Sequence, residues 1–201
     1  MLQLHRNAIS GNCYKVELLL HRLARPVELI DVTFGQPESE AQRAAVKSLS
    51  TIGRIPTLVL DDGRVLTESN AILCYLAEGT PYVPADAFDR AQVLRWMFFE
   101  QNLHEPHIAT RRFVMTQGDP SKVSADLLEI WLERGTDALG VMERHLSEHD
   151  WFGPAGYSIA DIALYAYTHV ADQGGYDLAP FPALRAWLER FAAQPGHRAM
   201  G

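Results

Sequence analysis

The stretch Ser10-Gly11-Asn12-Cys13 is the first candidate for chemistry, because it stands directly before an apolar helical run. Serine and asparagine are common at helix starts, so the stretch has a purely structural interpretation as a cap. A helix N-terminus also presents unpaired N–H groups and about half a positive charge, which stabilise a nearby anion such as a thiolate. The residues at this point leave both interpretations open.

A second candidate is the pair of histidines His104 and His107, with Glu105 nearby. Such side chains bind zinc when enough of them converge. Pro106 is expected to kink the helix that carries them, and no third ligand stands at a suitable spacing. We therefore expect no metal.

The two cysteines, Cys13 and Cys74, are too few for a disulfide framework, which favours a reducing compartment. Cys74 falls on an apolar helix face and is expected in the core. The first ten residues lack the pattern of a signal peptide, and no apolar run approaches the roughly 18 residues that cross a bilayer. We expect a soluble cytoplasmic protein that has no membrane partner.

The composition is that of an ordinary globular protein of 201 residues, 47% of them hydrophobic and 21% charged. The net charge is −7, and the clustered basic residues are Arg111 and Arg112. Because phosphate binding needs a basic stripe, nucleic acid is not an expected partner. An anionic ligand would have to be held by local donors rather than by the overall field.

The first 78 residues alternate strand and helix signals. Apolar periodicity predicts strands and helices, in turn, at 2–5, 13–24, 26–32 and 39–49. Residues 56–68 predict a hairpin, because Asp61-Asp62-Gly63 joins two apolar runs. A helix at 69–79, closed by Gly79, follows. The predicted order is βαβ followed by ββα.

Two prolines, Pro81 and Pro84, and the lack of periodicity in residues 79–89 predict a linker. We expect domains at 1–79 and 90–201, separated by a linker at 80–89. Helices are predicted at 87 to about 115, 121–148, 158–171 and 182–194. Ser158 and Asp161 have the spacing of a capping box, with Asp in place of Glu or Gln, so we expect them to begin a buried helix.

A βαβ–ββα half followed by an all-helical half resembles the cytosolic glutathione S-transferase family, over essentially the whole chain. The resemblance implies an α/β thioredoxin-like N-terminal domain that binds glutathione and an all-α C-terminal helical bundle. A fold alone does not fix a function, so the functional prediction depends on the motifs.

Thioredoxin-like domains carry a C-x-x-C pair where the first strand meets the first helix, and here Ser10 replaces the first cysteine. The resemblance to serine-type transferases implies that the Ser10 hydroxyl donates to the sulfur of glutathione and lowers its pKa, by about one to two units. The pattern formed by Ser10, Asn12 and Lys15 is also similar to bacterial Nu-type transferases, in which the asparagine amide contacts this sulfur. Cys13 is expected to be a packed thiol.

The segment Gly53-Arg54-Ile55-Pro56 resembles the cis-proline motif of the family. It implies that the backbone of Ile55, which precedes cis-Pro56, pairs with the cysteinyl part of glutathione. Arg54 then donates to a glutathione carboxylate. The family often has Asn-Pro-x-Gly-Lys-Val-Pro here, so this chain lacks the first Asn-Pro and has Arg in place of Lys.

Glu68 and Ser69 begin the helix that follows the hairpin. The Ser69 hydroxyl and the free N–H groups of the helix suit the α-carboxylate of the γ-glutamyl group, and Glu68 suits its ammonium. An ordinary helix cap with an acidic first turn is the alternative.

The family places an electrophile pocket beside the glutathione sulfur, lined by the first long helix of the C-terminal half. The candidates for this wall are His107, Thr110, Arg111 and Phe113. Arg111 or Arg112 can equally be a solvated or interface charge. On the same helix, Trp96, Phe98 and Phe99 are expected in the core or a subunit interface, and Glu100 could reach across a dimer interface.

The sequence therefore predicts a homodimeric, detoxifying glutathione transferase, with glutathione as co-substrate and a small electrophile as the second substrate. One alternative is a glutathione-dependent disulfide-bond reductase, in which a second glutathione resolves the mixed disulfide. The other is a non-enzymatic binding or regulatory protein with the same fold.

Overall fold

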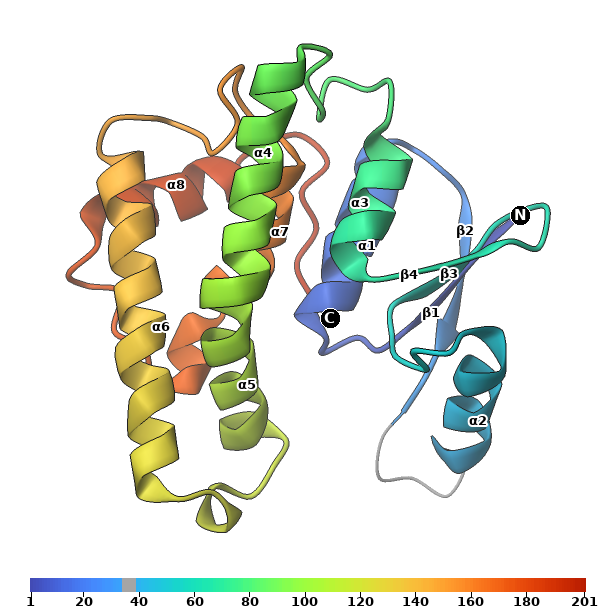
Figure 1. Ribbon diagram of the computed structural model, residues 1–201, viewed down its shortest axis with the longest axis horizontal. Helices are drawn as coiled ribbons and strands as arrows, with labels where there is room; N and C mark the ends of the chain where they lie inside the picture. Colours follow the sequence, from blue (N-terminus) through green and yellow to red (C-terminus); the bar gives the residue numbers. More distant parts are fainter. Residues whose placement is uncertain (34–38) are drawn as a thin grey trace. The chain divides into compact units, whose positions relative to one another are not determined.

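The structure is a computed structural model that describes residues 1–33 and 39–201 (Figure 1). The chain divides into two compact units. Unit 1 comprises Met1–Glu78 together with Pro195–Gly201, and unit 2 comprises Gly79–Gln194. The expected helical domain at 90–201 thus differs at its end, because its last seven residues belong to unit 1. A segment without hydrophobic periodicity gives no sequence signal for where it packs.

The described residues of unit 1 form a four-stranded mixed sheet with three helices, as predicted. In chain order its elements are β1 (Leu2–Arg6), α1 (Gly11–Arg22), β2 (Val27–Asp31), α2 (Ser39–Leu49), β3 (Thr57–Val59), β4 (Val65–Thr67) and α3 (Ser69–Ala77). The strand order is β2-β1-β3-β4, with β1 parallel to β2 and antiparallel to β3, and β4 antiparallel to β3. This is the thioredoxin-like arrangement.

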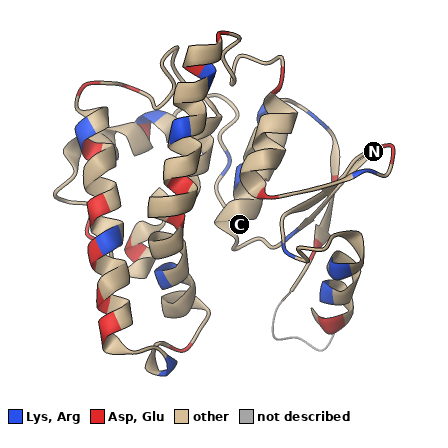
Figure 2. Ribbon diagram, viewed as in Figure 1, with Lys and Arg blue, Asp and Glu red and all other residues tan. Residues whose placement is uncertain are grey.

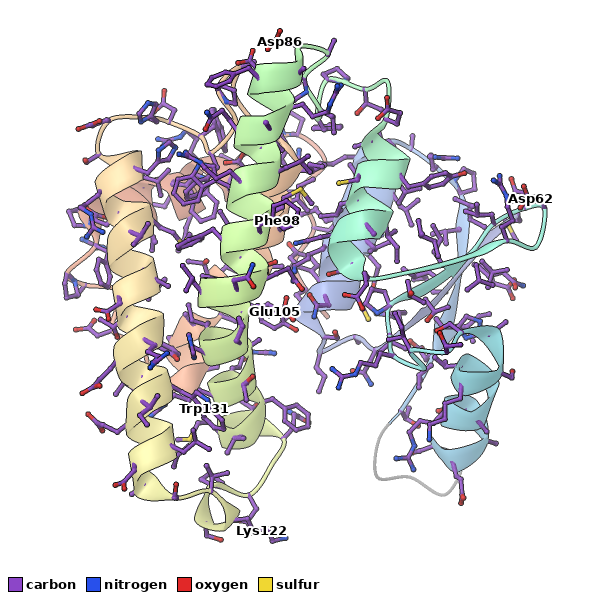
Figure 3. All side chains as sticks on the ribbon, in the orientation of Figure 1. Asp62, Asp86, Phe98, Glu105, Lys122 and Trp131 are labelled. Atoms are coloured by element: carbon purple, nitrogen blue, oxygen red, sulfur yellow. The ribbon has the colours of Figure 1, made fainter. Side chains whose placement is uncertain are left out.

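The core of unit 1 follows from the alternation of apolar residues along its strands. Leu4 in the middle of β1 is fully buried, as are Leu58 of β3 and Leu19 of α1. Helices α1 and α3 pack against each other (Figure 1). The β3–β4 hairpin turns at Gly63, whose φ of +83° suits glycine, beside Asp62 at the tip of the hairpin (Figure 3). The chain is thereby returned to the start of α3.

The C-terminal residues pack against α1 within unit 1. The Tyr14 hydroxyl donates to the carbonyl of Arg198 at 2.5 Å, and the Arg22 guanidinium donates to the carbonyl of Pro195 at 2.9 Å. Both donors lie on α1, the helix that begins at the stretch Ser10-Gly11-Asn12-Cys13, here called the Ser10 motif. The end of the chain therefore helps to hold this helix.

Unit 2 is all helical. Its elements are α4 (Ala87–Phe99), η1 (Glu100–His104), α5 (Glu105–Thr116), η2 (Pro120–Lys122), α6 (Ala125–Leu146), α7 (Ile159–Thr168), η3 (Ala171–Gly174) and α8 (Pro182–Ala192). The single helix predicted from 87 to about 115 is interrupted by the π-helical turn η1. Pro106 follows in the first turn of α5, where it needs no intrahelical N–H bond.

The capping box at Ser158 and Asp161 is confirmed, and it begins the fully buried helix α7. Both oxygens of Asp161 accept hydrogen bonds: Oδ1 from Phe152 N at 3.0 Å and Trp187 Nε1 at 3.1 Å, and Oδ2 from Ser158 N at 2.9 Å and Ser158 Oγ at 3.1 Å. Trp187 comes from α8, so this one carboxyl joins the start of α7 to another helix and to the loop before it.

Charged side chains of both signs are interspersed along α6 (Figure 2). Within residues 1–33 and 39–201, the structure contains no helix of sufficient length and apolarity to cross a membrane.

Candidate active site

Ser10 is the N-cap of α1, with an extended backbone conformation and an Oγ that accepts from Cys13 N at 3.4 Å. The capping interpretation is therefore observed. This bond uses an acceptor position of the hydroxyl, which also carries a hydrogen that it can donate. Capping and donation to a sulfur atom are consequently compatible at the same residue.

Cys13 is fully buried in α1. Burial raises the pKa of its thiol to about 11, although the interactions of Cys13 with the Ser10 side chain and with the Asn7 N–H act in the opposite direction. The thiol is therefore protonated at neutral pH and packed, as expected, and it is not a nucleophile. Cys74 on α3 is half-buried, and its pKa is also raised by burial.

The N-terminal ends of α1 and α3 meet through side chains that lie 57 positions apart in the sequence. The Ser69 hydroxyl donates to Asn12 Oδ1 at 3.1 Å. The ammonium of Lys15, which is completely buried, donates to Ser69 Oγ at 3.5 Å. Two of the predicted motifs thus form one cluster. The burial of Lys15 was not predicted. The position of this single lysine within the apolar run of α1 could have indicated it.

Glu68 precedes α3 with φ of +67° and ψ of 112°, a conformation that non-glycine residues rarely adopt. Such a backbone costs of order 1–3 kcal/mol and persists where the surroundings impose it, often at functional sites. The Glu68 side chain is exposed and makes no capping hydrogen bond to the described residues of α3. Its carboxylate therefore lies beside Ser69 without serving as the cap.

The peptide bond between Ile55 and Pro56 is cis, as predicted. Ile55 and the exposed Arg54 line a cavity of about 250 Å³ beside α2. The other described lining residues are Val32, Arg43, Val46, Lys47 and Gly53. The lining combines apolar side chains with three cations, an environment that suits a carboxylate on a small organic ligand.

In unit 2, the four residues predicted for an electrophile pocket all lie on α5. Phe113 is 54% exposed, and the pKa of the half-buried His107 is lowered by burial and by the charge of Arg134. Both effects favour the neutral imidazole of His107. Thr110 is partly exposed on the same helix.

The two arginines of α5 are both engaged within unit 2. Arg111 donates to the carbonyl of Leu128 at 3.2 Å and to that of Gly174, and its guanidinium lies 6.0 Å from the centre of the Tyr176 ring. Arg112 is buried and donates to Gln173 at 2.8 Å. Neither arginine is a solvated surface charge.

The remaining candidates of this helical segment are placed as follows. Trp96 is buried, and Phe98, near the end of α4, is 64% exposed (Figure 3). Glu100 is fully buried and accepts from Gln101. His104 Nε2 lies 2.8 Å from Thr168 Oγ1. Outside 34–38, no three His, Cys, Asp or Glu side chains are grouped so that they could hold a metal ion.

Comparison with known proteins decides the family. The family model described as "Glutathione S-transferase, N-terminal domain" matches residues 9–78. The model described as "Glutathione S-transferase, C-terminal domain" matches residues 106–190. This chain belongs to the glutathione S-transferase family. Its function is accordingly that of a glutathione transferase enzyme.

Similar proteins span nearly the whole chain. A glutathione S-transferase structure from Xanthobacter autotrophicus Py2 is 39% identical with a TM-score of 0.93, covering 100% of this chain and 97% of the other. One from Pseudomonas fluorescens is 44% identical with a TM-score of 0.90, covering 99% and 98%. The disulfide-bond oxidoreductase YfcG of Escherichia coli is 28% identical over 94% of this chain and 89% of its own length.

Proposed function

We propose that this transferase is of the serine type with a Nu-like Ser-x-Asn motif, and that it activates glutathione as a thiolate at the start of α1. Ser10 donates its hydroxyl hydrogen to the sulfur, and the Asn12 amide shares this role. The observation that carries the proposal is the 3.1 Å hydrogen bond between Ser69 and Asn12. It brings the motif suited to the sulfur next to the motif suited to the γ-glutamyl end.

The other contacts of glutathione follow from the same cluster. The α-carboxylate is bound by backbone N–H groups at the start of α3, including that of Ser69, and the ammonium is bound by Glu68. The zwitterionic end needs both charges within a few ångströms, and adjacent residues supply them. The backbone of Ile55, before cis-Pro56, pairs with the cysteinyl part. Arg54 donates to the carboxylate at the other end.

The reaction consists of thiolate formation and attack. The thiol proton leaves to solvent, and the positive end of α1 with the Ser10 donor stabilises the remaining charge. The sulfur lone pair then forms a bond to carbon of a small electrophile, and the leaving group departs with its electron pair. We assign the electrophile-facing wall to His107, Thr110, Arg111 and Phe113 of α5, with Arg111 bracing the wall through its contacts to α6 and η3.

The decisive experiment is a pH titration of the protein–glutathione complex that follows thiolate absorbance in the near ultraviolet. S-methylglutathione, which has no thiol, supplies the blank. We expect thiolate to form clearly below the pKa of a free thiol, roughly 8.5–9. Glutathione that binds with an unshifted thiol would contradict the proposal and favour a carrier or regulatory protein.

Disulfide-bond reduction by glutathione is the second candidate. Cys13 is buried with a raised thiol pKa, so this reduction would have to proceed without a protein thiolate. The thiolate of one glutathione attacks a disulfide and displaces the first product thiolate, and a second glutathione attacks the mixed disulfide and displaces the other. Two glutathiones are oxidised to one glutathione disulfide for each disulfide reduced, so no protein thiolate is required. YfcG carries the name of this activity.

This second activity has its own test. A Cys13→Ser variant should reduce disulfides at an unchanged rate, with two glutathiones consumed per disulfide. Loss of reduction in the folded variant would show that a protein cysteine takes part.

We also propose that the protein is a homodimer. Three large apolar side chains of α4 and η1 are more than half exposed in the single chain: Phe88, Phe98 and Leu103. Where such side chains form one contiguous patch, the patch marks a protein–protein interface. Sedimentation equilibrium should give twice the chain mass, and a monomer at micromolar concentration would contradict this. The family resemblance also supports a cytoplasmic location and a role in detoxification.

A further inference from the structure

Lys15 is unusual because its charged side chain is completely buried among the apolar residues of α1. Transfer of an ammonium out of water costs several kcal/mol unless hydrogen bonds and charges compensate for it. Lys15 lies three positions after Asn12, so the two side chains share one face of the helix. A buried lysine beside the residues that hold glutathione is therefore a candidate for a role in the site.

The chemistry of the three side chains fixes the direction of their hydrogen bonds. An ammonium can only donate, and the amide oxygen of asparagine can only accept. Lys15 Nζ therefore donates to Ser69 Oγ, at 3.5 Å, and the Ser69 hydroxyl donates its one hydrogen to Asn12 Oδ1, at 3.1 Å. The ammonium thus occupies an acceptor position of Ser69 and favours the orientation in which the serine hydrogen points to Asn12.

This orientation determines how Asn12 presents its amide. The amide group is planar, so with Oδ1 held toward Ser69 the Nδ2 hydrogens are turned away from Ser69. If the amide were turned by 180°, Oδ1 would face the sulfur in place of Nδ2. An amide oxygen has no hydrogen to donate, and its partial negative charge repels a thiolate. The amide orientation of Asn12 that can donate to a thiolate is therefore the orientation that the hydrogen bonds of Lys15 and Ser69 favour.

We propose that Lys15 is a positioning residue, which acts through Ser69 to hold the Asn12 amide in the orientation that donates to the glutathione sulfur. This inference rests on the proposed function, because it assigns Lys15 a part in thiolate formation. It predicts a coupling between Lys15 and Asn12 that a buried lysine with only a structural role would not have.

The test is a double-mutant cycle on the thiol pKa of bound glutathione, measured by the same ultraviolet titration. Lys15→Met replaces the ammonium by an apolar group of similar length, which a buried site tolerates well. We expect the thiol pKa to rise by about one unit in this variant, and by no more than it rises in Asn12→Ala. In the Asn12→Ala background, Lys15→Met should produce no further rise.

Lys122→Met is the matched control, because it removes the same charge from an exposed side chain of unit 2 and should leave the thiol pKa unchanged. If Lys15→Met does not fold, Lys15→Gln enters the same cycle. A thiol pKa unaltered by Lys15→Met would overturn this inference alone. An equal rise in both backgrounds would also overturn it, because Lys15 would then act by its charge and independently of Asn12. A wild-type complex without a lowered thiol pKa would overturn both this inference and the proposed function.

Discussion

Two opposing effects act on the pKa of the Asp161 carboxyl, and the pH dependence of stability measures which of them is larger. Four hydrogen-bond donors favour the ionised form, whereas complete burial disfavours it. Burial dominates and raises the pKa of Asp161 from its ordinary value of 3.8 to about 6. The difference corresponds to about 3 kcal/mol of stability that depends on pH.

The sign follows from proton binding. Folded Asp161 holds its proton more tightly than the unfolded chain does, so its contribution to stability is complete below pH 3.8 and is lost as the pH rises through about 6. An asparagine at this position does not titrate. From about pH 4.5 to about pH 7.5, the free energy of unfolding of the wild type should therefore fall by about 2 kcal/mol relative to Asp161→Asn.

Urea unfolding of both proteins at these two pH values, followed by tryptophan fluorescence, measures this difference. Other titrating groups are common to both proteins and cancel. Asp137→Asn, which changes an exposed carboxyl of α6, is the control and should show no comparable trend. A stability difference that is constant or that rises with pH would refute the reasoning, because the four donors would then outweigh burial.

Three further predictions concern unit 1. Ser10→Asp keeps a capping acceptor but places a negative charge beside the sulfur, so the melting temperature should be retained while the titration shows a raised thiol pKa for bound glutathione. Glu68→Ala removes the partner of the glutathione ammonium, and Ser69→Ala removes the hydroxyl that joins the start of α3 to Asn12 and Lys15. Each should weaken glutathione binding by about 1–3 kcal/mol in calorimetry, and near-normal affinity in both would remove the site assignment. Tyr14→Phe loses the bond to the Arg198 carbonyl, so it should cost about 1 kcal/mol and speed amide hydrogen exchange in the C-terminal segment; unchanged exchange would contradict the docking of that segment.

Local patterns were sufficient to predict most elements of the fold. The Asp61-Asp62-Gly63 turn, the capping box at Ser158 and the helix that begins at Ser69 all depend on residues within a few positions of one another. Their conformations are determined by turn and cap chemistry that a sequence displays directly. The cis bond before Pro56 was different, because only the family resemblance indicated it.

Features that depend on distant residues could not be predicted in this way. The hydrogen bond of Trp187 to Asp161 joins two helices, and the packing of Pro195–Gly201 against α1 joins the two ends of the chain. The π-helical turn at η1 also has no periodic signal, since Pro106 indicates a break without specifying its form. The burial of Lys15 arises only when α3 covers that face of α1.

The structural and functional interpretations of the serines at the helix starts need not exclude each other. A hydroxyl both accepts and donates, so Ser10 can accept from Cys13 N as a cap and still donate to a sulfur atom. Ser69 already does both, because it accepts from Lys15 and donates to Asn12. A sequence shows only that a serine stands at a helix start, and what its hydrogen faces is decided by residues from another helix. For this reason the role of Ser10 could not be decided from its sequence neighbours, and the proposal of a catalytic role depends on the contact between α1 and α3.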